Sequence, residues 1–363
     1  MFLNPNRSQY RQTDRDRIGK SHAGHVRRAL EKCPAHRPTP LLPLPAMAAE
    51  LGVARIDVKA EWSRMGLTSF KALGGGYAVA TLVMARAGTT DLLSPAVKPI
   101  ASGMTMICAS AGNHGLAVAA AARAFGTRAV VVLSEAVPEI FAHRLRDQGA
   151  TVVRAGATYE DSMANAATMA EQNGWHLVSD SASPGNTETP LAVMQGYTVL
   201  LDEAAGELAV PATHIFVQAG VGGLAASAAA YLRDRWGEDF KFIVVESEGA
   251  PCLLESVRQG RLTRVTGSPT KLGRLDCKEP SLIALDLLAH LADAFLLVSD
   301  AQAEEAAARL DRAGAPVSPC GATGAAGLIA ACNNAAWRKQ LNLDANSRIL
   351  IIGTEAQENR SDP

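Results

Sequence analysis

Short apolar runs rich in β-branched residues alternate with alanine-rich stretches of helical pattern along most of the chain. The apolar runs lie at 104–110, 129–133, 151–155, 175–180, 214–220, 240–247 and 348–354. Apolar runs of this length, each followed by a helical stretch, are typical of parallel strands that are buried on both faces. The alternation therefore predicts an α/β fold of three-layer α/β/α domains with mainly parallel sheets.

Length and charge narrow the kind of protein. The chain has 363 residues, which is more than one ordinary domain needs. Its 35 basic and 36 acidic residues give a net charge of -1, which argues against a generally basic nucleic-acid-binding surface. No apolar stretch reaches the about 18 residues of a spanning helix, and the N-terminal segment has no apolar signal core. The six cysteines include no Cys-x-x-Cys pair, so we expect free thiols, no metal site and a cytoplasmic location.

The first candidate for chemistry is Lys71, which follows Ser69 and Phe70 and precedes an apolar helical stretch. A lysine in this position is a candidate for burial, and burial lowers the pKa of a lysine because it disfavours the charged form. A neutral amine is what covalent bonding to a carbonyl group requires. Taken alone, the segment also fits a surface lysine at a helix start.

A second segment joins a predicted strand to a long alanine-rich helix, and it contains Ser110, Ala111, Gly112, Asn113 and His114. Free backbone amides at the start of such a helix can bind an anion such as a carboxylate. Asn113 adds a side-chain amide at the mouth of the sheet, where ligands of open α/β folds bind. An ordinary capping turn would also explain Ser110 and Gly112.

The third segment follows the predicted strand at 214–220 and opens a helix, and it consists of Gly220, Val221, Gly222, Gly223 and Leu224. Glycines let the backbone approach a phosphate closely, and the helix dipole favours an anion there. The same run fits Gly-x-Gly-x-x-Ala, with Glu246 ending the next strand as in a dinucleotide fingerprint. By itself this segment leaves NAD and other phosphate-bearing cofactors as alternatives.

Two more polar residues close predicted strands. Asp180 ends the run 175–180, where its carboxylate could reach a cleft or form a turn. Thr354 and Glu355 end the run 348–354 and could touch a bound ring or cap a turn. Because ligands of open α/β sheets bind at the carboxyl ends of the strands, these residues are candidates for a site.

Taken together and in chain order, these segments resemble the fold-type II pyridoxal phosphate enzymes, which include threonine and serine dehydratases and the tryptophan synthase β chain. Lys71 looks like the lysine that carries the cofactor. Residues 110–115 look like the loop for the substrate carboxylate, and residues 220–224 look like the phosphate loop. The resemblance implies pyridoxal 5'-phosphate as cofactor, with Asn113 at the ring oxygen and Thr354 at the ring nitrogen, and a small amino acid as substrate.

Within this group the chain resembles the diaminopropionate ammonia-lyases, in the segments FKALGG at 70–75, GNHG at 112–115 and QAGVG at 218–222. The resemblance implies α,β-elimination from 2,3-diaminopropionate to give pyruvate and ammonia. That family typically has an aspartate before GNHG, thought to take the α-proton of the D-isomer, where this chain has Ala111. A methyl group cannot act as a base, so we expect preference for the L-isomer, with Lys71 or Asp180 taking the α-proton.

The resemblance also implies a domain arrangement. Residues 1–74 and 191–363 would form a large cofactor-binding domain, and residues 75–190 a small mobile domain that carries the carboxylate loop. It implies a homodimer as well, and a close approach of Cys252 and Cys277 that could act as a redox-sensitive clip. The segments 88–103 and 264–280 have neither strand nor helix pattern, and the second is expected to be a flap or an oligomer contact.

Three other functions stay open at this point. The chain could dehydrate serine, threonine or hydroxyaspartate, which Ala111 favours because L-specific dehydratases often lack an acid there. It could be an NAD-dependent oxidoreductase, although that leaves Lys71 and Asn113 unexplained. It could also be a non-catalytic relative that binds the cofactor as a sensor.

Overall fold

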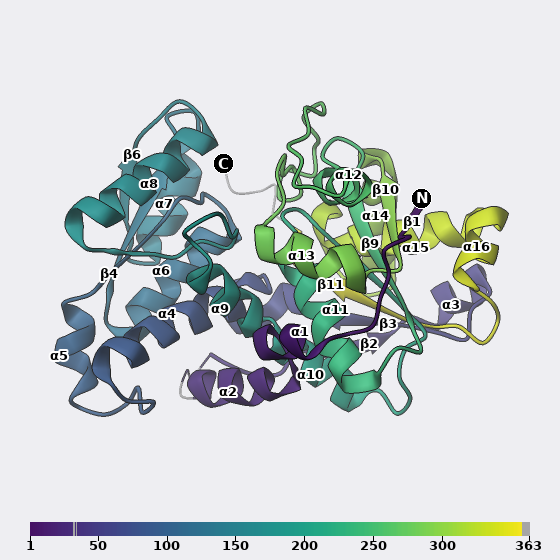
Figure 1. Cartoon of the computed structure of the whole chain (residues 1–363), viewed down its shortest axis with the longest axis horizontal. Coiled ribbons are helices and arrows are strands. Elements are labelled where there is room, and N and C mark those ends of the chain that lie inside the picture. The colour runs from purple at the N-terminus through teal and green to yellow at the C-terminus, as the bar shows by residue number, and fades with distance from the viewer. Residues whose placement is uncertain (32, 34, 358–363) are drawn as a thin grey trace.

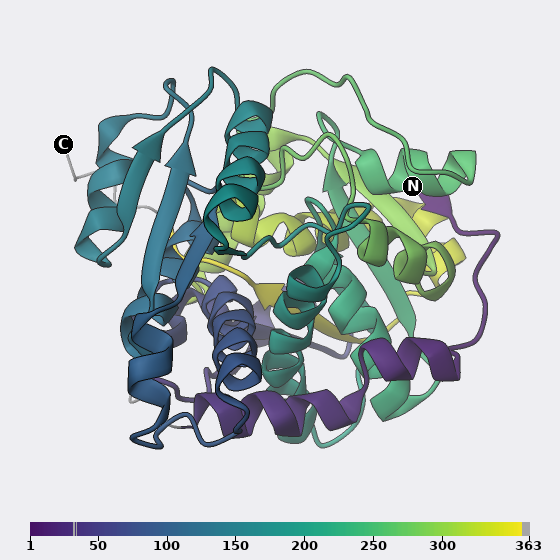
Figure 2. The same ribbon diagram turned by 60° about the vertical axis from the view of Figure 1, so that its left-hand side comes forward.

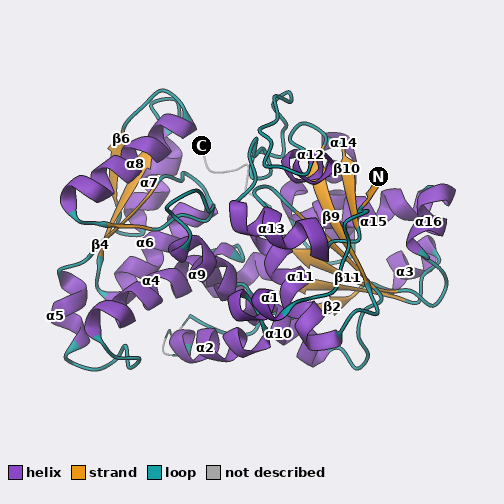
Figure 3. Cartoon of the chain, in the orientation of Figure 1, coloured by secondary structure: helices purple, strands orange, loops and turns teal. Residues whose placement is uncertain are grey.

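The protein's structure is a computed structural model, and it describes residues 1–31, 33 and 35–357. Its strands form two sheets, one in each lobe of Figure 1, and Figure 3 shows them in orange. The larger sheet has the strand order β1 (Phe2–Leu3), β10 (Ala294–Val298), β9 (Lys241–Ser247), β8 (His214–Gln218), β11 (Arg348–Gly353), β3 (Arg55–Ala60) and β2 (Leu41–Pro43). The smaller sheet has the order β6 (Thr151–Arg154), β5 (Arg128–Leu133), β4 (Thr105–Cys108) and β7 (His176–Leu177).

Parallel pairing dominates both sheets. Strands β10, β9, β8, β11 and β3 pair in parallel, as do all four strands of the smaller sheet. The edge strands β1 and β2 of the larger sheet pair antiparallel with their neighbours. The α/β fold with mainly parallel sheets, predicted from the alternating pattern, is therefore confirmed.

Helices fill the connections and cover the sheets. They are α1 (Gln12–Arg17), α2 (Lys20–Leu30), α3 (Pro45–Leu51), α4 (Lys71–Ala87), α5 (Val97–Ser102), α6 (Asn113–Phe125), α7 (Glu139–Asp147), α8 (Tyr159–Asn173), α9 (Glu188–Gly196), α10 (Thr198–Glu207), α11 (Gly223–Trp236), α12 (Cys252–Gln259), α13 (Leu282–Leu291), α14 (Asp300–Arg312), α15 (Pro319–Asn333) and α16 (Ala335–Leu341), with one 3-10 turn, η1 (Glu61–Gly66). None of the helices in these ranges is long and apolar enough to cross a membrane.

The larger sheet separates two apolar cores because successive side chains of a strand point to opposite faces. In β8, Ile215 and Val217 belong to the core that also contains buried alanines of α11, whereas Phe216 belongs to the core with buried alanines of α15. The strand is buried along its whole length. This two-sided burial is why the strand reads as a continuous apolar run rather than as an alternating one.

The structure differs from the sequence expectations in a few elements. The strand expected at 175–180 is only His176–Leu177, because after the Val178 amide donates to the Ile107 carbonyl (2.8 Å) the chain leaves the sheet. Asp180 therefore lies in the following loop and does not end the strand. Strands β1, β2, β3 and β10 were not expected, and the segment 88–103 contains the short helix α5. Residues 264–280 contain neither helix nor strand, as expected.

Helix α4 makes unusually close contacts with its neighbours, and α4 and α9 lie between the two sheets (Figure 2). A Cβ atom on Gly74 would lie 2.5 Å from Cε1 of Tyr197, and one on Gly75 would lie 2.8 Å from Cβ of Ala117 in α6. A Cβ on Gly196 would lie 2.6 Å from the Leu73 carbonyl oxygen. Glycine at these positions therefore lets the backbones of α4, α6 and α9 approach one another closely.

We predict that Gly74→Ala destabilises the protein by about 1–3 kcal/mol, because the added methyl overpacks the contact with Tyr197. The matched control is Gly76→Ala in the same helix, where the nearest atom, Cδ2 of Leu30, would be 3.4 Å away. That change should be neutral or stabilising by up to about 1 kcal/mol from helix propensity. Urea unfolding of both variants measures the difference, and equal midpoints would contradict the packing argument.

Candidate active site

Each sheet has one place where the strand order reverses. In the larger sheet β9 and β10 continue on one side of β8 while β11 lies on the other, and in the smaller sheet β5 and β7 flank β4. Connections that diverge from the carboxyl ends of such strands leave a crevice in which ligands bind. The candidate residues follow four of the strands at these places. Residues 110–113 come after β4, Asp180 after β7, residues 220–223 after β8 and Thr354 after β11.

The two residues expected to be catalytic meet in the structure. Lys71 is the first residue of α4, and its Nζ atom donates a hydrogen bond to Oδ2 of Asp180. Both side chains are largely buried, with 23% and 21% of their surfaces exposed. The ammonium group also lies 5.5 Å from the ring centre of Phe70. Lys71, which lies after β3 of the larger sheet, thus forms an ion pair with Asp180, which lies after β7 of the smaller sheet.

The charge state of this pair differs from the sequence expectation. Burial by itself lowers the pKa of Lys71, but the Asp180 carboxylate outweighs it and the pKa lies above its usual range. Burial likewise favours the neutral form of Asp180, yet the Lys71 ammonium holds the pKa of Asp180 well below its usual range. The expectation that burial leaves Lys71 neutral is therefore wrong for the cofactor-free protein, because the charges of Lys71 and Asp180 stabilise each other.

A buried charge cluster holds the loop that leads to Lys71. Met65 and Thr68 adopt positive φ angles of 53° and 57°, which are strained for residues other than glycine. Just before them, the fully buried Arg64 donates to Glu61 (2.7 Å) and to Glu203 of α10 (2.6 Å). These ion pairs fix the loop against the larger domain, and nothing in the spacing of the sequence indicated them.

The segment 110–115 begins α6 at the crevice. His114 is buried, its Nε2 atom lies 2.9 Å from the Val178 carbonyl oxygen, and burial lowers the pKa of the imidazole. As a neutral ring it donates to that carbonyl and ties α6 to β7. Ser110 accepts a hydrogen bond from the Gly112 amide at 3.3 Å. His114 therefore has a structural contact, while the role of the segment in substrate binding stays a prediction.

Glu355 connects three separate parts of the chain. Its carboxylate accepts hydrogen bonds from the side-chain amide of Asn113 and from the Ser318 hydroxyl (2.6 Å) at the start of α15. Arg274 forms an ion pair with the same carboxylate at 2.9 Å. The sequence indicated only that Glu355 ends a strand near a ligand, whereas the structure makes it a link between both sheets and the segment 264–280.

That segment, residues 264–280, is held at two points and is called the flap below. Arg274 contacts the largely buried Glu355, while Arg264 forms an exposed ion pair (2.6 Å) with Glu160 in the first turn of α8. The flap therefore runs from the larger domain to a helix that packs on the smaller sheet.

The loop after β8 has room for a ligand at its helix end. Gly222 has a φ of 95°, a conformation that favours glycine, and Gly223 begins α11. A Cβ on Gly223 would have no neighbour nearer than 3.6 Å, whereas one on Gly220 would lie 2.9 Å from Sγ of Cys277. The Cys252 thiol donates to the Gly220 carbonyl at 3.6 Å. Both cysteines are free thiols, and both contact the glycine at the start of this loop.

Two residues that sequence reasoning missed lie beside the candidates. Tyr197 is fully buried, its ring centre is 4.8 Å from that of Phe70, and burial raises the pKa of its phenol to about 12 against the effect of the Lys71 charge. Within the described residues its hydroxyl makes no hydrogen bond of ordinary geometry. Gln218, the last residue of β8, donates to the Thr354 hydroxyl at 2.9 Å. Gln218 belongs to the segment QAGVG, but nothing in the sequence indicated a role for either residue.

Glu246 does not face a ligand. It is fully buried, and its carboxylate accepts the backbone amides of Leu253 and Leu254 (2.8 Å each) at the start of α12. A dinucleotide fingerprint needs an acidic residue free to bind a ribose. Glu246 is occupied as a helix cap, so the NAD alternative loses the residue on which it depended.

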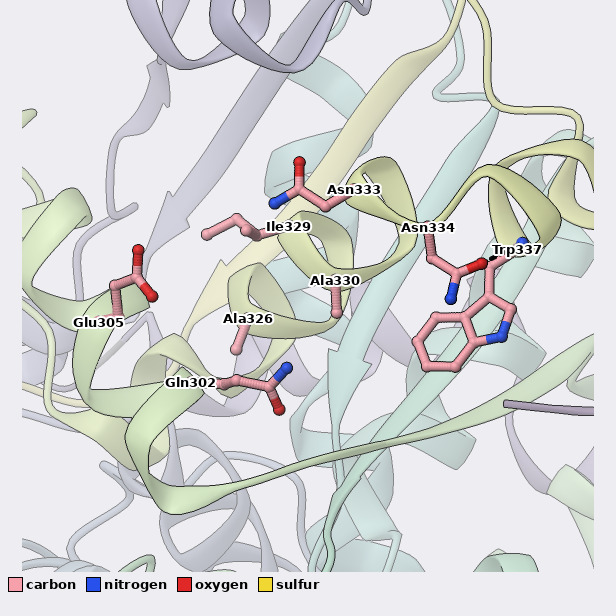
Figure 4. A pocket seen from close by; sticks show the side chains of 8 residues that line it. All are labelled: Gln302, Glu305, Ala326, Ile329, Ala330, Asn333, Asn334 and Trp337. Atoms are coloured by element: carbon pink, nitrogen blue, oxygen red, sulfur yellow. Dashed lines mark hydrogen bonds between the residues drawn. The ribbon is translucent and has the colours of Figure 1, made fainter.

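The groove in Figure 4 lies elsewhere on the larger domain. It has a volume of about 290 Å³ and is lined by residues of α14, α15 and α16 around Trp337. None of the candidate residues lines it. Among the residues that the structure describes, no group of histidine, cysteine, aspartate and glutamate side chains is arranged to hold a metal ion.

A lysine and a carboxylate at the switch points, with a glycine loop at a helix start, define a cofactor-dependent α/β enzyme. The family model "Pyridoxal-phosphate dependent enzyme" matches residues 33–355, so the chain belongs to this family. The diaminopropionate ammonia-lyase of Escherichia coli (strain K12) is 32% identical over 354 residues, covering 93% of this chain and 89% of that protein. The L-serine dehydratase/L-threonine deaminase of Mus musculus is 30% identical over 171 residues, covering 46% of this chain and 50% of that protein.

Solved structures agree with the fold. The Escherichia coli diaminopropionate ammonia-lyase, in complex with an aminoacrylate-PLP azomethine reaction intermediate, has a TM-score of 0.89 at 29% identity. That match covers 98% of this chain and 93% of the other. Two three-layer domains of the fold-type II class, with pyridoxal phosphate as the cofactor of the family, are thereby confirmed.

We predict that Asp180→Asn speeds covalent capture of pyridoxal phosphate by the cofactor-free protein at neutral pH. Loss of the carboxylate removes the charge that raises the pKa of Lys71, so a larger fraction of the amine is neutral at a given pH. Stopped-flow absorbance between about pH 6 and 9 should show the capture profile moved to lower pH. The control is Asp276→Asn, which removes a carboxylate paired with Lys278 in the flap, and an unmoved profile for Asp180→Asn would contradict the assignment.

Proposed function

We propose that the protein catalyses a pyridoxal phosphate-dependent α,β-elimination that converts L-2,3-diaminopropionate to pyruvate and ammonia. The observation that carries the proposal is the ion pair of Lys71, which begins α4, and Asp180, which follows β7 of the smaller sheet. It is supported by the similarity to the Escherichia coli ammonia-lyase along most of both chains.

The residues present fit the cofactor. The backbone amides at the start of α11, around Gly222 and Gly223, would hold the phosphate, since a helix start favours an anion and glycine leaves the backbone at Gly223 uncovered by a side chain of its own. Val221 and Leu224 contribute backbone to the same loop. Lys71 supplies the amine, and the buried Tyr197 hydroxyl is a polar group for which a bound ligand can provide a partner. We assign Asn113 to the ring oxygen and Thr354 to the ring nitrogen.

Pyridoxal phosphate, when bound, supplies an electron sink that stabilises negative charge at the α-carbon of the substrate. The substrate carboxylate is assigned to Ser110, Ala111, Gly112 and His114 at the start of α6, through the backbone amides of this segment and the Ser110 hydroxyl. Residues 75–190, which include this loop, are proposed to move as a small domain against 1–74 and 191–363.

Lys71 and Asp180 are assigned the proton transfers. Asp180 is ionised beside the Lys71 ammonium, so it is ready to accept the α-proton of the L-isomer. Once Lys71 is no longer charged, the main influence on Asp180 is burial, which favours its protonated form. Asp180 can then pass a proton to the β-amine, which must leave as ammonia because an amide ion is too basic to depart.

A homodimer in the cytoplasm is the proposed state of the enzyme. The free thiols of Cys252 and Cys277, together with the other free cysteines, are compatible with a reducing compartment. The dimer is supported by the family resemblance, and light scattering measures it directly.

One observation favours a second candidate, dehydration of a β-hydroxy amino acid such as serine, threonine or hydroxyaspartate. Ala111 replaces the acid expected before GNHG, and the chain is also similar over half its length, at 28% identity, to the Homo sapiens protein named serine dehydratase-like. A hydroxide leaving group needs the same proton from Asp180. The two activities differ in the number of ammonia molecules released.

We predict two ammonia molecules per pyruvate when the holoenzyme acts on L-2,3-diaminopropionate, since the β-amine leaves first and the α-amine is lost on hydrolysis. A panel that includes serine, threonine and hydroxyaspartate, assayed for both products, measures this ratio. Lys71→Ala should lose the near-visible absorbance of the bound cofactor and all turnover. One ammonia per oxoacid product, with diaminopropionate inert, would instead establish the dehydratase.

We predict that the L-isomer of diaminopropionate is turned over at least about a hundredfold faster than the D-isomer, the size of effect expected when one positioned proton acceptor is absent. Asp180→Asn should slow the L-reaction by a similar factor, and Ala111→Asp should raise the rate with the D-isomer. Equal rates for the two isomers in the unaltered enzyme would contradict the role assigned to Ala111.

A further inference from the structure

Gln218 occupies a fully enclosed position at the carboxyl end of β8. Its Nε2 atom lies 2.9 Å from the Gly321 carbonyl oxygen, 3.0 Å from the Ile352 carbonyl oxygen and 2.9 Å from Oγ1 of Thr354. The residue is buried, and it joins β8 to β11 and to the first turn of α15. The side chain thus touches the strand end that carries Thr354.

Only one orientation of the Gln218 amide is compatible with these contacts. If the amide were turned over, its oxygen would face two backbone carbonyl oxygens, which cannot donate a hydrogen bond. The NH2 group must therefore point to Gly321, Ile352 and Thr354, and its two protons are shared among these three acceptors. Because an NH2 group is only a donor, the Thr354 hydroxyl accepts in this contact and its own proton points elsewhere.

The hydroxyl proton of Thr354 has no protein acceptor in the described ranges, although the residue is buried. Thr354 lies next to the site, because its carbonyl oxygen accepts the Phe70 amide (3.1 Å) just before Lys71. A buried hydroxyl whose proton is directed away from its protein neighbour is available to an acceptor on a ligand.

The arrangement leaves one buried polar atom without a partner. Oε1 of Gln218 makes no hydrogen bond within the described residues, and it faces the backbone of α15 at Gly324, where an added Cβ would lie 2.9 Å away. An unpaired buried carbonyl destabilises a folded protein. An amide at this position is explained by the hydrogen bond that its NH2 group donates to the Thr354 hydroxyl, in spite of the unpaired Oε1 atom.

We propose that Gln218 is a positioning residue that forces Thr354 to act as a hydrogen-bond donor toward the ring nitrogen of pyridoxal phosphate. The inference rests on the proposed function for the identity of the ligand. Without Gln218, no donor holds the lone pair of the Thr354 hydroxyl, so the hydroxyl can rotate and point its proton away from the ligand. A lone pair of Thr354 would face the ring nitrogen, which would then have to carry its own proton to make the contact.

The test uses the holoenzyme and four changes: Gln218→Met, Thr354→Val, the double variant and, as a matched control, Gln195→Met. Gln195 is a half-buried glutamine of α9 whose amide donates to the Arg17 carbonyl at 2.9 Å, away from the site. Two quantities are measured, the dissociation constant of pyridoxal phosphate by equilibrium dialysis and the pH dependence of its near-visible absorbance. Thermal unfolding identifies variants that fold, and Gln218→Asn, whose shorter side chain cannot reach Thr354, replaces Gln218→Met if needed.

Each single change at Gln218 or Thr354 should weaken cofactor binding about tenfold, the effect of one lost hydrogen bond. The double variant should bind no worse than Thr354→Val, because Gln218 acts through that hydroxyl. Gln218→Met should also gain a pH-dependent absorbance that the Thr354→Val background lacks, while Gln195→Met should match the unaltered protein.

Effects of Gln218 and Thr354 that multiply in the double variant would overturn the proposal, since they would show that Gln218 only supports packing. Cofactor binding and spectra unchanged in Gln218→Met would overturn it as well. Failure of the proposed function gives a different result. The unaltered holoenzyme would then release no ammonia from diaminopropionate, while the effects of the Gln218 and Thr354 substitutions on cofactor binding would still be non-additive.

Discussion

The ion pair of Lys71 and Asp180 is the contact on which the site depends. One partner starts the helix after the strained loop that follows β3, and the other follows β7 of the smaller sheet. A buried charge without a counterion is strongly disfavoured, so each residue needs the other to remain charged in this place. Any reaction that removes the charge of Lys71 leaves the Asp180 carboxylate without its counterion. Covalent bonding at Lys71 is therefore coupled to protonation of Asp180.

The pair can form only because the two sheets are brought close together. Glycines at 74, 75 and 196 let α4 lie against α6 and α9 with almost no side-chain layer between them. This close approach brings the carboxyl ends of β4 and β7 within reach of residues that follow β8, β11 and β3. Packing in the helices between the sheets is therefore as important for the site as the polar residues themselves.

Much of this arrangement could be predicted from the sequence, because it depends on local pattern. The alternating runs predicted the parallel sheets, and the candidate residues follow four strand ends that meet at the switch points. Strand β3 was missed because its sequence, RIDVKA, contains charged residues that look exposed, whereas Asp57 and Lys59 are buried and paired with distant or neighbouring charges.

The parts that could not be predicted depend on contacts between residues far apart in the chain. The charged state of Lys71 follows from Asp180, which is 109 residues away. The roles of Glu355, Tyr197 and Gln218 likewise follow from partners brought in by other elements, and a single sequence shows neither the partners nor the direction of a hydrogen bond.

The flap has two ion-pair anchors of different kinds, and they respond differently to dissolved salt. The pair of Arg264 and Glu160 is exposed, with about half of each side chain in solvent, so mobile ions screen it. The pair of Arg274 and Glu355 has a carboxylate that is only 6% exposed, and such a pair is screened much less. Ionic strength thus weakens the outer anchor of the segment 264–280 and leaves the inner anchor, at Glu355, largely unaffected.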